Sequence, residues 1–343
     1  MSDLPAFGPG RHLLSVQQFD TSSLRSFFDL TDAVRPIAER HSICTVLDGA
    51  ILGSLFFEPS TRTRLSFESA FLRLGGEVTS TTGFSFSSMA KGESLHDTAR
   101  VVSGYSDVLV MRHPDEGSVS EFAAASLVPV INAGDGTGEH PSQALLDVYT
   151  LRHELDTRGR TVDGSTVAII GDLKYGRTVH SLMKLLSLAA TGITFKVYSP
   201  PSLELPIEVA DYARARGHAV HVVNDVIEAV SGSDAVYATR VQRERITEEV
   251  LANANVRGNL LNKEILARAG ATGIIIMHPL PRDSRKNSFD LSDDVDDLPG
   301  LSIFHQTDNG LMIRMAIFLT TLGCSIGQVQ ACMKQRPWDA TLR

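Results

Sequence analysis

The segment 56–64, which reads FFEPSTRTR, has the residue types of a site for a phosphorylated ligand. It follows a predicted strand and comes before a predicted helix, Leu65–Leu74, that a glycine pair ends. At such a helix start, free backbone N–H groups, the positive end of the helix dipole and side-chain donors converge. A phosphoryl group fits there. The alternative is that Ser60 only caps the helix, while Arg62 and Arg64 are solvated surface residues.

Two arginines, Arg177 and Arg240, each follow a predicted strand in the second half of the chain. A planar guanidinium pairs with a carboxylate in a forked geometry, so the two together suit a substrate with two carboxylates. Taken singly, either arginine would equally suit a surface ion pair. The segment 171–180 lacks the G-x-G-x-x-G pattern, and no G-x-x-x-x-G-K-[ST] occurs in the chain. Neither a dinucleotide nor ATP therefore has its usual phosphate cradle.

Further polar residues follow two predicted strands of the first half. The segment 111–114 reads MRHP, and the segment 138–143 reads GEHPSQ. Both lie where predicted parallel strands end, which is the edge at which open α/β sheets bind ligands. A single histidine is more often structural than catalytic, and we interpret His113 in that way.

The stretch Thr81–Ser94 is polar, contains glycines and has neither a helical nor a strand period. It predicts a loop that carries Lys91. Irregular loops of this length are usually functional or disordered. The alternative for Lys91 is a solvated surface residue.

These motifs resemble those of the aspartate and ornithine carbamoyltransferases, over a span from about His12 to Leu322. The marks of the resemblance are STRTR after FEP, the segments 111–114 and 138–143, the Lys-Gly-Glu run at 91–93, and HPLPR at 278–282. It implies an enzyme that moves the carbamoyl group of carbamoyl phosphate to an amine, without a metal or another cofactor.

The resemblance also implies the residues of the site. Carbamoyl phosphate would be bound by Ser60, Thr61, Arg62, Thr63, Ser87, Lys91, Arg112, His140, Gln143, Leu280 and Pro281. The catalytic residues among these would be Arg62, Thr63, Lys91, Arg112 and His140. The second substrate, aspartate, would be bound by Lys91, Arg177, Arg240, Gln242 and Leu280. In this family Gln143 takes the carbamoyl NH₂, and the backbone carbonyls of Leu280 and Pro281 accept from the attacking amine and that NH₂.

The resemblance to the whole family leaves open which amine accepts the carbamoyl group. Ornithine enzymes have His-Cys-Leu-Pro where this chain has Pro279 after His278, and this favours L-aspartate and pyrimidine biosynthesis. An enzyme with another amine acceptor, such as ornithine, and a non-catalytic subunit of the same family are the alternatives. The segment 283–301 departs from the expected family pattern. The resemblance further implies a homotrimer in which Ser87 and Lys91 reach into the neighbouring subunit, with a regulatory chain or another pyrimidine-pathway enzyme as a possible partner.

The elements that position these residues alternate along the chain. Short apolar runs predict strands at 51–57, 77–82, 107–111, 128–131, 166–170, 195–198, 235–239 and 273–277. Most are followed by a turn and a segment of helical period, so we predict an α/β protein with two domains, each a mostly parallel sheet flanked by helices. The predicted domains are 1–155 for carbamoyl phosphate, joined by a helix at Pro141–Leu155, and 156–308 for aspartate. The residues 309–343, with a helix at Gly310–Leu322, would return to the first domain, and Asp283–Pro299 would be a loop.

Length and composition agree with this reading. A chain of 343 residues exceeds the size of one ordinary core, so two domains are expected. The net charge of −8 argues against nucleic acid as the main partner. The three cysteines lack C-x-x-C spacing, so no disulfide framework or structural zinc site is indicated. No segment has the length of a membrane span or the pattern of a targeting peptide, so we expect a cytoplasmic protein, unless a transit peptide has been removed.

Overall fold

The structure is a computed structural model that describes residues 4–83, 91–242, 260–283 and 290–338. The chain forms two compact units, of which the first combines 1–142 with 308–343 and the second is 143–307. The two divisions fall inside helices, α6 (Pro141–Asp156) and α12 (Ile303–Thr321). The boundary predicted at residue 155 lies at the opposite end of the same helix, α6.

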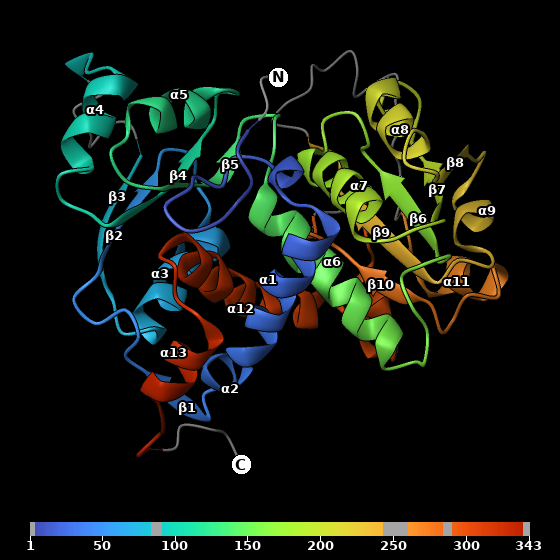
Figure 1. Cartoon of the computed structure of the whole chain (residues 1–343). Coiled ribbons are helices and arrows are strands. Elements are labelled where there is room, and N and C mark those ends of the chain that lie inside the picture. Colours follow the sequence, from blue (N-terminus) through green and yellow to red (C-terminus); the bar gives the residue numbers. More distant parts are fainter. Residues whose placement is uncertain (1–3, 84–90, 243–259, 284–289, 339–343) are drawn as a thin grey trace. The chain divides into compact units, whose positions relative to one another are not determined.

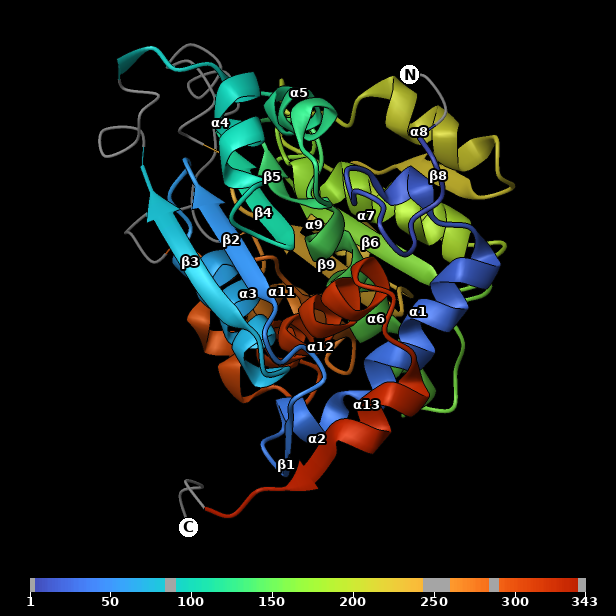
Figure 2. The same cartoon turned by 60° about the vertical axis from the view of Figure 1, so that its left-hand side comes forward.

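The first unit contains a parallel sheet with the strand order β3-β2-β4-β5, whose strands lie side by side in Figure 2. Its strands are β2 (Ile51–Phe56), β3 (Glu77–Thr82), β4 (Val108–His113) and β5 (Val130–Asp135). Every residue of β4 and β5 is buried, as expected for parallel strands covered on both faces. Because the strands are parallel, their carboxyl ends meet at one edge of the sheet.

This unit also contains helices, some of which lie against the sheet and others away from it (Figure 1). They are α1 (Thr21–Ala33), α2 (Arg35–Ala38), α3 (Thr61–Arg73), α4 (Leu95–Val102), α5 (Ser118–Ala125) and α13 (Ile326–Cys332), with a 3₁₀ turn η1 (Val16–Gln18). A buried cluster joins the sheet to α4 and α5 through Leu55, Leu109, Met111, Ala99, Val119 and Phe122. The two ends of the chain also meet within this unit. Phe318 of α12 packs edge-on against Phe67 and Phe71 of α3, and β1 (Ser42–Cys44) pairs antiparallel with β11 (Met333–Gln335).

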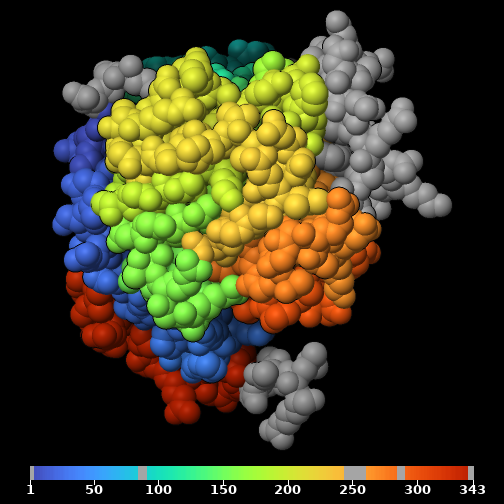
Figure 3. Space-filling model, turned by 90° about the vertical axis from the view of Figure 1, so that its right-hand side faces the viewer, coloured from blue at the N-terminus to red at the C-terminus, as the bar shows by residue number. Residues whose placement is uncertain are grey.

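The second unit contains a parallel sheet with the strand order β10-β9-β6-β7-β8. Its strands are β6 (Thr166–Gly171), β7 (Thr194–Tyr198), β8 (Ala219–Val222), β9 (Ala235–Thr239) and β10 (Ile275–Met277). Its other elements are α7 (Arg177–Ala189), α8 (Ile207–Arg214), α9 (Val226–Val230), α11 (Lys263–Arg268) and a 3₁₀ turn η4 (Asp293–Asp297). In the space-filling view the dark-yellow surface around α9 adjoins the orange surface around α11 (Figure 3).

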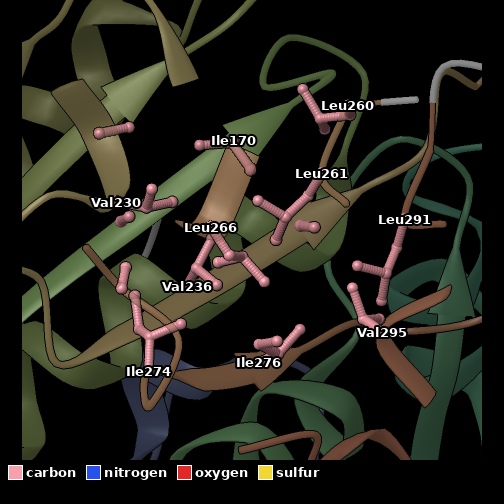
Figure 4. Packing of buried hydrophobic residues seen from close by; sticks show 14 of the residues in the cluster. Ile170, Val230, Val236, Leu260, Leu261, Leu266, Ile274, Ile276, Leu291 and Val295 are labelled. Carbon is pink, nitrogen blue, oxygen red and sulfur yellow. The ribbon is translucent and has the colours of Figure 1, made fainter. Parts of the chain in front are cut away.

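Aliphatic side chains from the sheet, α9 and α11 form the core on one face of this unit. Figure 4 shows Val236 and Ile276 of the sheet, Val230 of α9 and Leu266 of α11 gathered in one cluster. Leu291 and Val295 of the segment that departs from the family pattern are buried in the same cluster. The described part of that segment, from residue 290 on, is therefore anchored by its apolar residues.

The predicted fold class is confirmed, because both units are parallel sheets flanked by helices and the C-terminal helix belongs in part to the first unit. All eight predicted strands are present, with shifted ends in several cases. The sequence reasoning missed β8, β1 and β11. The helix predicted to start at Leu65 begins at Thr61, and the closing helix predicted from Gly310 begins at Ile303. The predicted loop 283–299 contains η4, and its residues 284–289 lie outside the described part of the chain.

Among the described residues, no single helix is long and apolar enough to cross a membrane. The helices α12 and α13, bent by 111°, reach such a length and composition only when taken together. The same described residues contain no group of three or more His, Cys, Asp or Glu side chains placed to hold a metal ion.

Candidate active site

Most of the predicted site residues follow the carboxyl ends of neighbouring strands. In the first unit the predicted residues from Ser60 to Thr63, Arg112 and His140 follow or end β2, β4 and β5, which are adjacent in the sheet. In the second unit Arg177, Arg240 and the turn at 278–281 follow β6, β9 and β10, which are also adjacent. In each unit separately, the fold thus brings the predicted groups to the edge of the sheet at which ligands bind.

The phosphate motif forms the first turn of α3. Ser60 is the N-cap residue, yet its side chain makes no capping hydrogen bond and donates instead to Thr63 Oγ1, at 2.9 Å. The alternative, in which the Ser60 side chain only caps the helix, is therefore wrong. Thr61 and Arg62 are exposed and Thr63 is buried, so donors of this turn are open to a ligand while Thr63 is fixed by packing. A helix start with hydroxyl and guanidinium groups is a suitable anion site.

Arg112, near the end of β4, is 9% exposed and is held by contacts within its unit. Its Nη2 lies 2.7 Å from Glu58 Oε2, and its Nη1 donates to the carbonyl oxygen of Ala133 at 3.2 Å. The β4–β5 register is irregular between Met111 and His113, at the position of Arg112. Sequence reasoning missed Glu58, although an acidic residue inside a basic motif was a usable signal. This carboxylate fixes the guanidinium and offsets part of its charge.

His140 follows β5 and is 3% exposed, with its Nδ1 at 3.4 Å from Ser142 Oγ. The preceding residue, Glu139, accepts hydrogen bonds from Ser15 Oγ at 2.9 Å and from the backbone N–H of Val16 at 3.0 Å. Glu139 thus ties the N-terminal segment to the His140 turn.

His113 also lies in this region, and its Nδ1 accepts from the backbone N–H of Asp115 at 3.1 Å. Burial lowers the pKa of His113, so the neutral imidazole that this bond requires is favoured. The contact is of the kind that a structural histidine makes.

Lys91 lies shortly before α4, and its side chain is exposed. Ser87, predicted to act with it, lies outside the described residues. The role of both residues therefore stays a prediction.

In the second unit a buried aspartate joins the two loops that carry the predicted aspartate-binding arginines. Asp172 Oδ1 accepts from the backbone N–H of Tyr175, and its Oδ2 accepts from that of Gln242, both at 3.0 Å. The first bond holds the loop that leads to Arg177, and the second holds the loop that carries Arg240. Burial raises the pKa of Asp172, while the backbone N–H donors favour its ionised form. Sequence reasoning missed this residue too.

The two arginines differ in exposure. Arg177 is the first residue of α7 and is only 5% exposed. Arg240 is half-buried, and its Nη1 donates to the carbonyl oxygen of Val241 at 3.2 Å. Gln242 Nε2 lies 3.5 Å from the carbonyl oxygen of Arg240, so the side chain lies back over its own loop.

The turn that follows β10 is held by His278, which is 1% exposed. Its Nδ1 accepts from the backbone N–H of Leu280 at 2.9 Å, and this leaves Nε2 to donate to Asp290 Oδ1 at 2.7 Å. The Leu280–Pro281 peptide bond is cis, and Leu280 has a φ of 55°. The carbonyl groups predicted to face the substrate therefore belong to a tightly bonded turn.

A cavity of about 230 Å³ in the second unit does not coincide with these residues. It is lined by Arg158, Arg160, Asp234, Ile274 and neighbouring residues, which lie near the amino ends of β9 and β10. It contains none of the predicted site residues, and the site is defined by the converging polar groups instead.

Two consecutive segments of the chain match family descriptions. Residues 11–153 match the carbamoyl-P binding domain of aspartate/ornithine carbamoyltransferase, and residues 163–321 match its Asp/Orn binding domain. The chain belongs to the aspartate/ornithine carbamoyltransferase family. The resemblance found in the sequence is thereby confirmed.

Individual members of the carbamoyltransferase family are similar over nearly the whole chain. The aspartate carbamoyltransferase catalytic subunit of Dichelobacter nodosus is 52% identical over 318 residues, which are 93% of this chain and 91% of that protein. The chloroplastic aspartate carbamoyltransferase of Arabidopsis thaliana is 45% identical over 88% of this chain and 75% of that protein. Aspartate transcarbamoylase from Trypanosoma cruzi, solved with carbamoyl phosphate and aspartate, has a TM-score of 0.81 at 37% identity, covering 93% of this chain and 100% of that one. The same enzyme solved with N-(phosphonacetyl)-L-aspartic acid has a TM-score of 0.79 at 36% identity, covering 94% and 99%.

Proposed function

We propose that this chain transfers the carbamoyl group of carbamoyl phosphate to the α-amine of L-aspartate, giving N-carbamoyl-L-aspartate and phosphate for pyrimidine biosynthesis. The observation that carries the proposal is the pair of loops with Arg177 and Arg240, which follow neighbouring strands and are joined by Asp172. Two guanidinium groups in such loops suit an acceptor with two carboxylates. The similarity to proteins named as aspartate carbamoyltransferases supports the same acceptor.

Electrostatics favours this assignment of roles. Both substrates are anionic, and each close pair of like charges costs about 4 kcal/mol at an effective dielectric constant of about 20. The proposed site offsets this cost with positive side chains, namely Arg62, Lys91, Arg112, Arg177 and Arg240. Such a concentration of cations in a chain with a net charge of −8 is a local feature that serves anionic ligands.

In the proposed mechanism the amine nitrogen of aspartate attacks the carbonyl carbon of carbamoyl phosphate. A C–N bond forms, and negative charge builds up on the carbonyl oxygen, to which Thr63, Arg112 and His140 donate as preorganised groups. The bond between the carbonyl carbon and the phosphate oxygen then breaks, and the leaving phosphate takes the proton of the amine. Gln143 and the carbonyls of Leu280 and Pro281 accept from the carbamoyl NH₂ and the amine, and so orient both for attack.

The acceptor is tested by turnover. The purified chain is given carbamoyl phosphate with either L-aspartate or L-ornithine, and the carbamoylated product is measured. Formation of N-carbamoyl-L-aspartate at a kcat/KM at least about 10³-fold above that for ornithine is expected, because a cationic side chain does not pair with Arg240 or Arg177. A preference for ornithine, or no turnover with either amine, contradicts the proposal.

The proposed assembly is a cytoplasmic homotrimer in which Ser87 and Lys91 complete the site of the adjacent subunit, and a regulatory chain or another pathway enzyme is a candidate partner. The exposed position of Lys91 and the resemblance to the family support the shared site. Lys91→Ala and Arg62→Ala chains, each inactive alone, are mixed after reversible dissociation and reassembled. Part of the wild-type activity is expected to return, because some sites then combine intact Arg62 and Lys91. Mixtures as inactive as their components would exclude sharing.

A further inference from the structure

A series of hydrogen-bonded polar side chains in the second unit begins at the half-buried Gln143, in the first turn of α6. Asp147, one turn later, is fully buried and lies at its centre. Its Oδ1 accepts from Gln143 Nε2 at 2.9 Å and from Gln306 Nε2 at 2.6 Å, and its Oδ2 accepts from Tyr237 OH at 2.8 Å. A carboxylate with this many donors is compensated despite its burial.

The Asp147 carboxylate determines the orientation of the side-chain amides of Gln143 and Gln306. An ionised carboxylate only accepts hydrogen bonds, so each glutamine must present its NH₂ to Asp147. The amide oxygen of Gln143 is thereby turned away from Asp147 and becomes the acceptor that this side chain offers. The amide oxygen of Gln306 likewise faces away and accepts the backbone N–H of His278 at 3.0 Å.

The series ends at the turn after β10. His278 receives the bond from Gln306 at its backbone N–H, and its ring accepts from Leu280 and donates to Asp290. Tyr237 stays protonated as a donor, since burial and the facing Asp147 carboxylate raise its pKa. One carboxylate is thus connected to Gln143 directly and to the Leu280 turn through a single side chain, Gln306.

We propose that Asp147 is the positioning residue for recognition of the carbamoyl NH₂: it holds the oxygen of Gln143 toward that group and, through Gln306, holds the turn whose carbonyls accept from it. This inference rests on the proposed function. Its consequence is selectivity between carbamoyl phosphate and acetyl phosphate, which has a methyl group in place of the NH₂. A site built to accept from an N–H group discriminates against an analogue that lacks it.

The test compares Asp147→Leu, Asp147→Asn and the matched control Thr150→Val. Thr150 is equally buried on the same helix and donates to the carbonyl oxygen of Leu146. For each chain the inhibition constant of acetyl phosphate and the dissociation constant of carbamoyl phosphate are measured. Leucine has the same branched shape and number of side-chain heavy atoms as aspartate but accepts no hydrogen bonds. The Oδ1 of asparagine can still accept from both glutamine amides, which both bond Oδ1 of Asp147.

Asp147→Leu is expected to weaken carbamoyl phosphate binding about tenfold, the size of one hydrogen bond, with acetyl phosphate binding within about twofold of wild type. Asp147→Asn is expected to restore most of the discrimination, and Thr150→Val to leave it unchanged. The inference is overturned if Asp147→Leu weakens the binding of carbamoyl phosphate and of acetyl phosphate equally. It is also overturned if that chain discriminates between the two ligands as well as wild type does.

A second measurement does not depend on the folding of a variant. In a crystal structure of the wild-type chain with carbamoyl phosphate, Gln143 Oε1 is expected within hydrogen-bond distance of the carbamoyl nitrogen, with Nε2 still on Asp147. A Gln143 amide bonded elsewhere overturns the inference even in an enzyme that is active with aspartate. Absence of turnover in the wild-type chain would instead contradict the proposed function.

Discussion

At the scale of single residues, the site is defined as much by partners of the predicted groups as by the groups themselves. Arg112 is held between Glu58 and the carbonyl oxygen of Ala133, and Asp172 holds the loops of both predicted aspartate-binding arginines. These partners fix side chains that would otherwise have many rotamers. Preorganised donors stabilise developing charge more than mobile donors do.

Arg112→Lys tests this point. A lysine carries the same charge, but one ammonium group cannot reproduce the fork that contacts Glu58 and Ala133 and still point a donor at the carbonyl oxygen. We expect kcat to fall about 10²-fold at saturating substrates, as for the loss of one oxyanion donor. Arg100→Lys, at an exposed position of α4, is the control. A kcat within about threefold of wild type would show that charge alone suffices at position 112.

At the scale of elements, the second unit depends on a close approach of two strand ends. Gly171 ends β6 with a φ of 119°, and a Cβ atom built on it would lie 2.0 Å from the carbonyl oxygen of Thr239 at the end of β9. Only glycine allows this approach. The loops of Asp172 and Arg240 start at these two positions, so their spacing depends on it.

Gly171→Ala is therefore expected to raise the KM for aspartate and to destabilise the protein by more than the roughly 1 kcal/mol typical of alanine at a positive φ. Gly164→Ala is the matched control, because Gly164 also has a positive φ, of 70°, but no atom within 4 Å of a Cβ. The difference in thermal midpoint and in KM between the two variants measures the clash. Equal effects in both would mean that the strand ends move apart freely.

The sequence predicted those elements that have a local signal. Long apolar runs such as 166–170 and 235–239 identify central strands, and the motifs at their ends identify the predicted site. Strand β8 is short, with one buried, one half-buried and two exposed residues, and so has no such run, and β1 and β11 exist only as a pair. Hydrogen bonds between residues far apart in sequence cannot be predicted from a local pattern. Asp147 and Gln306 are 159 residues apart, and Asp147 and Tyr237 are 90 apart.

At the scale of the whole molecule, the buried His113 and the half-buried His12 make stability depend on pH. The Nδ1 atoms of His12 and His113 accept from the backbone N–H groups of Val130 and Asp115, which requires neutral rings. Burial lowers the pKa of both, and Arg11 lowers that of His12 further. Their contribution to the free energy of unfolding is fully present above pH 6.5, the pKa of an unfolded histidine. It is lost as the pH falls from 6.5 through the lower pKa values of the folded protein.

We therefore expect the thermal midpoint to fall between about pH 7.5 and pH 5.5, by an amount equivalent to about 1.4 kcal/mol for each unit of pKa shift. In the His12→Asn, His113→Asn chain this fall should be smaller, because the asparagine oxygen accepts the same bonds and does not titrate. Comparison with wild type at each pH cancels the contributions of other groups. Parallel curves for the two chains would exclude these histidines as the cause.

The first unit is assembled from both ends of the chain, and this has a consequence for biosynthesis. Its early strand β1 pairs with β11, and Phe67 and Phe71 contact Phe318, so the partners of its N-terminal part leave the ribosome only after the second unit. The second unit is one continuous stretch, 143–307, and all of it emerges before the first unit has its missing residues. On the ribosome, the continuous second unit is thus the part that can fold first, while the first unit is incomplete until 308–343 have been synthesised.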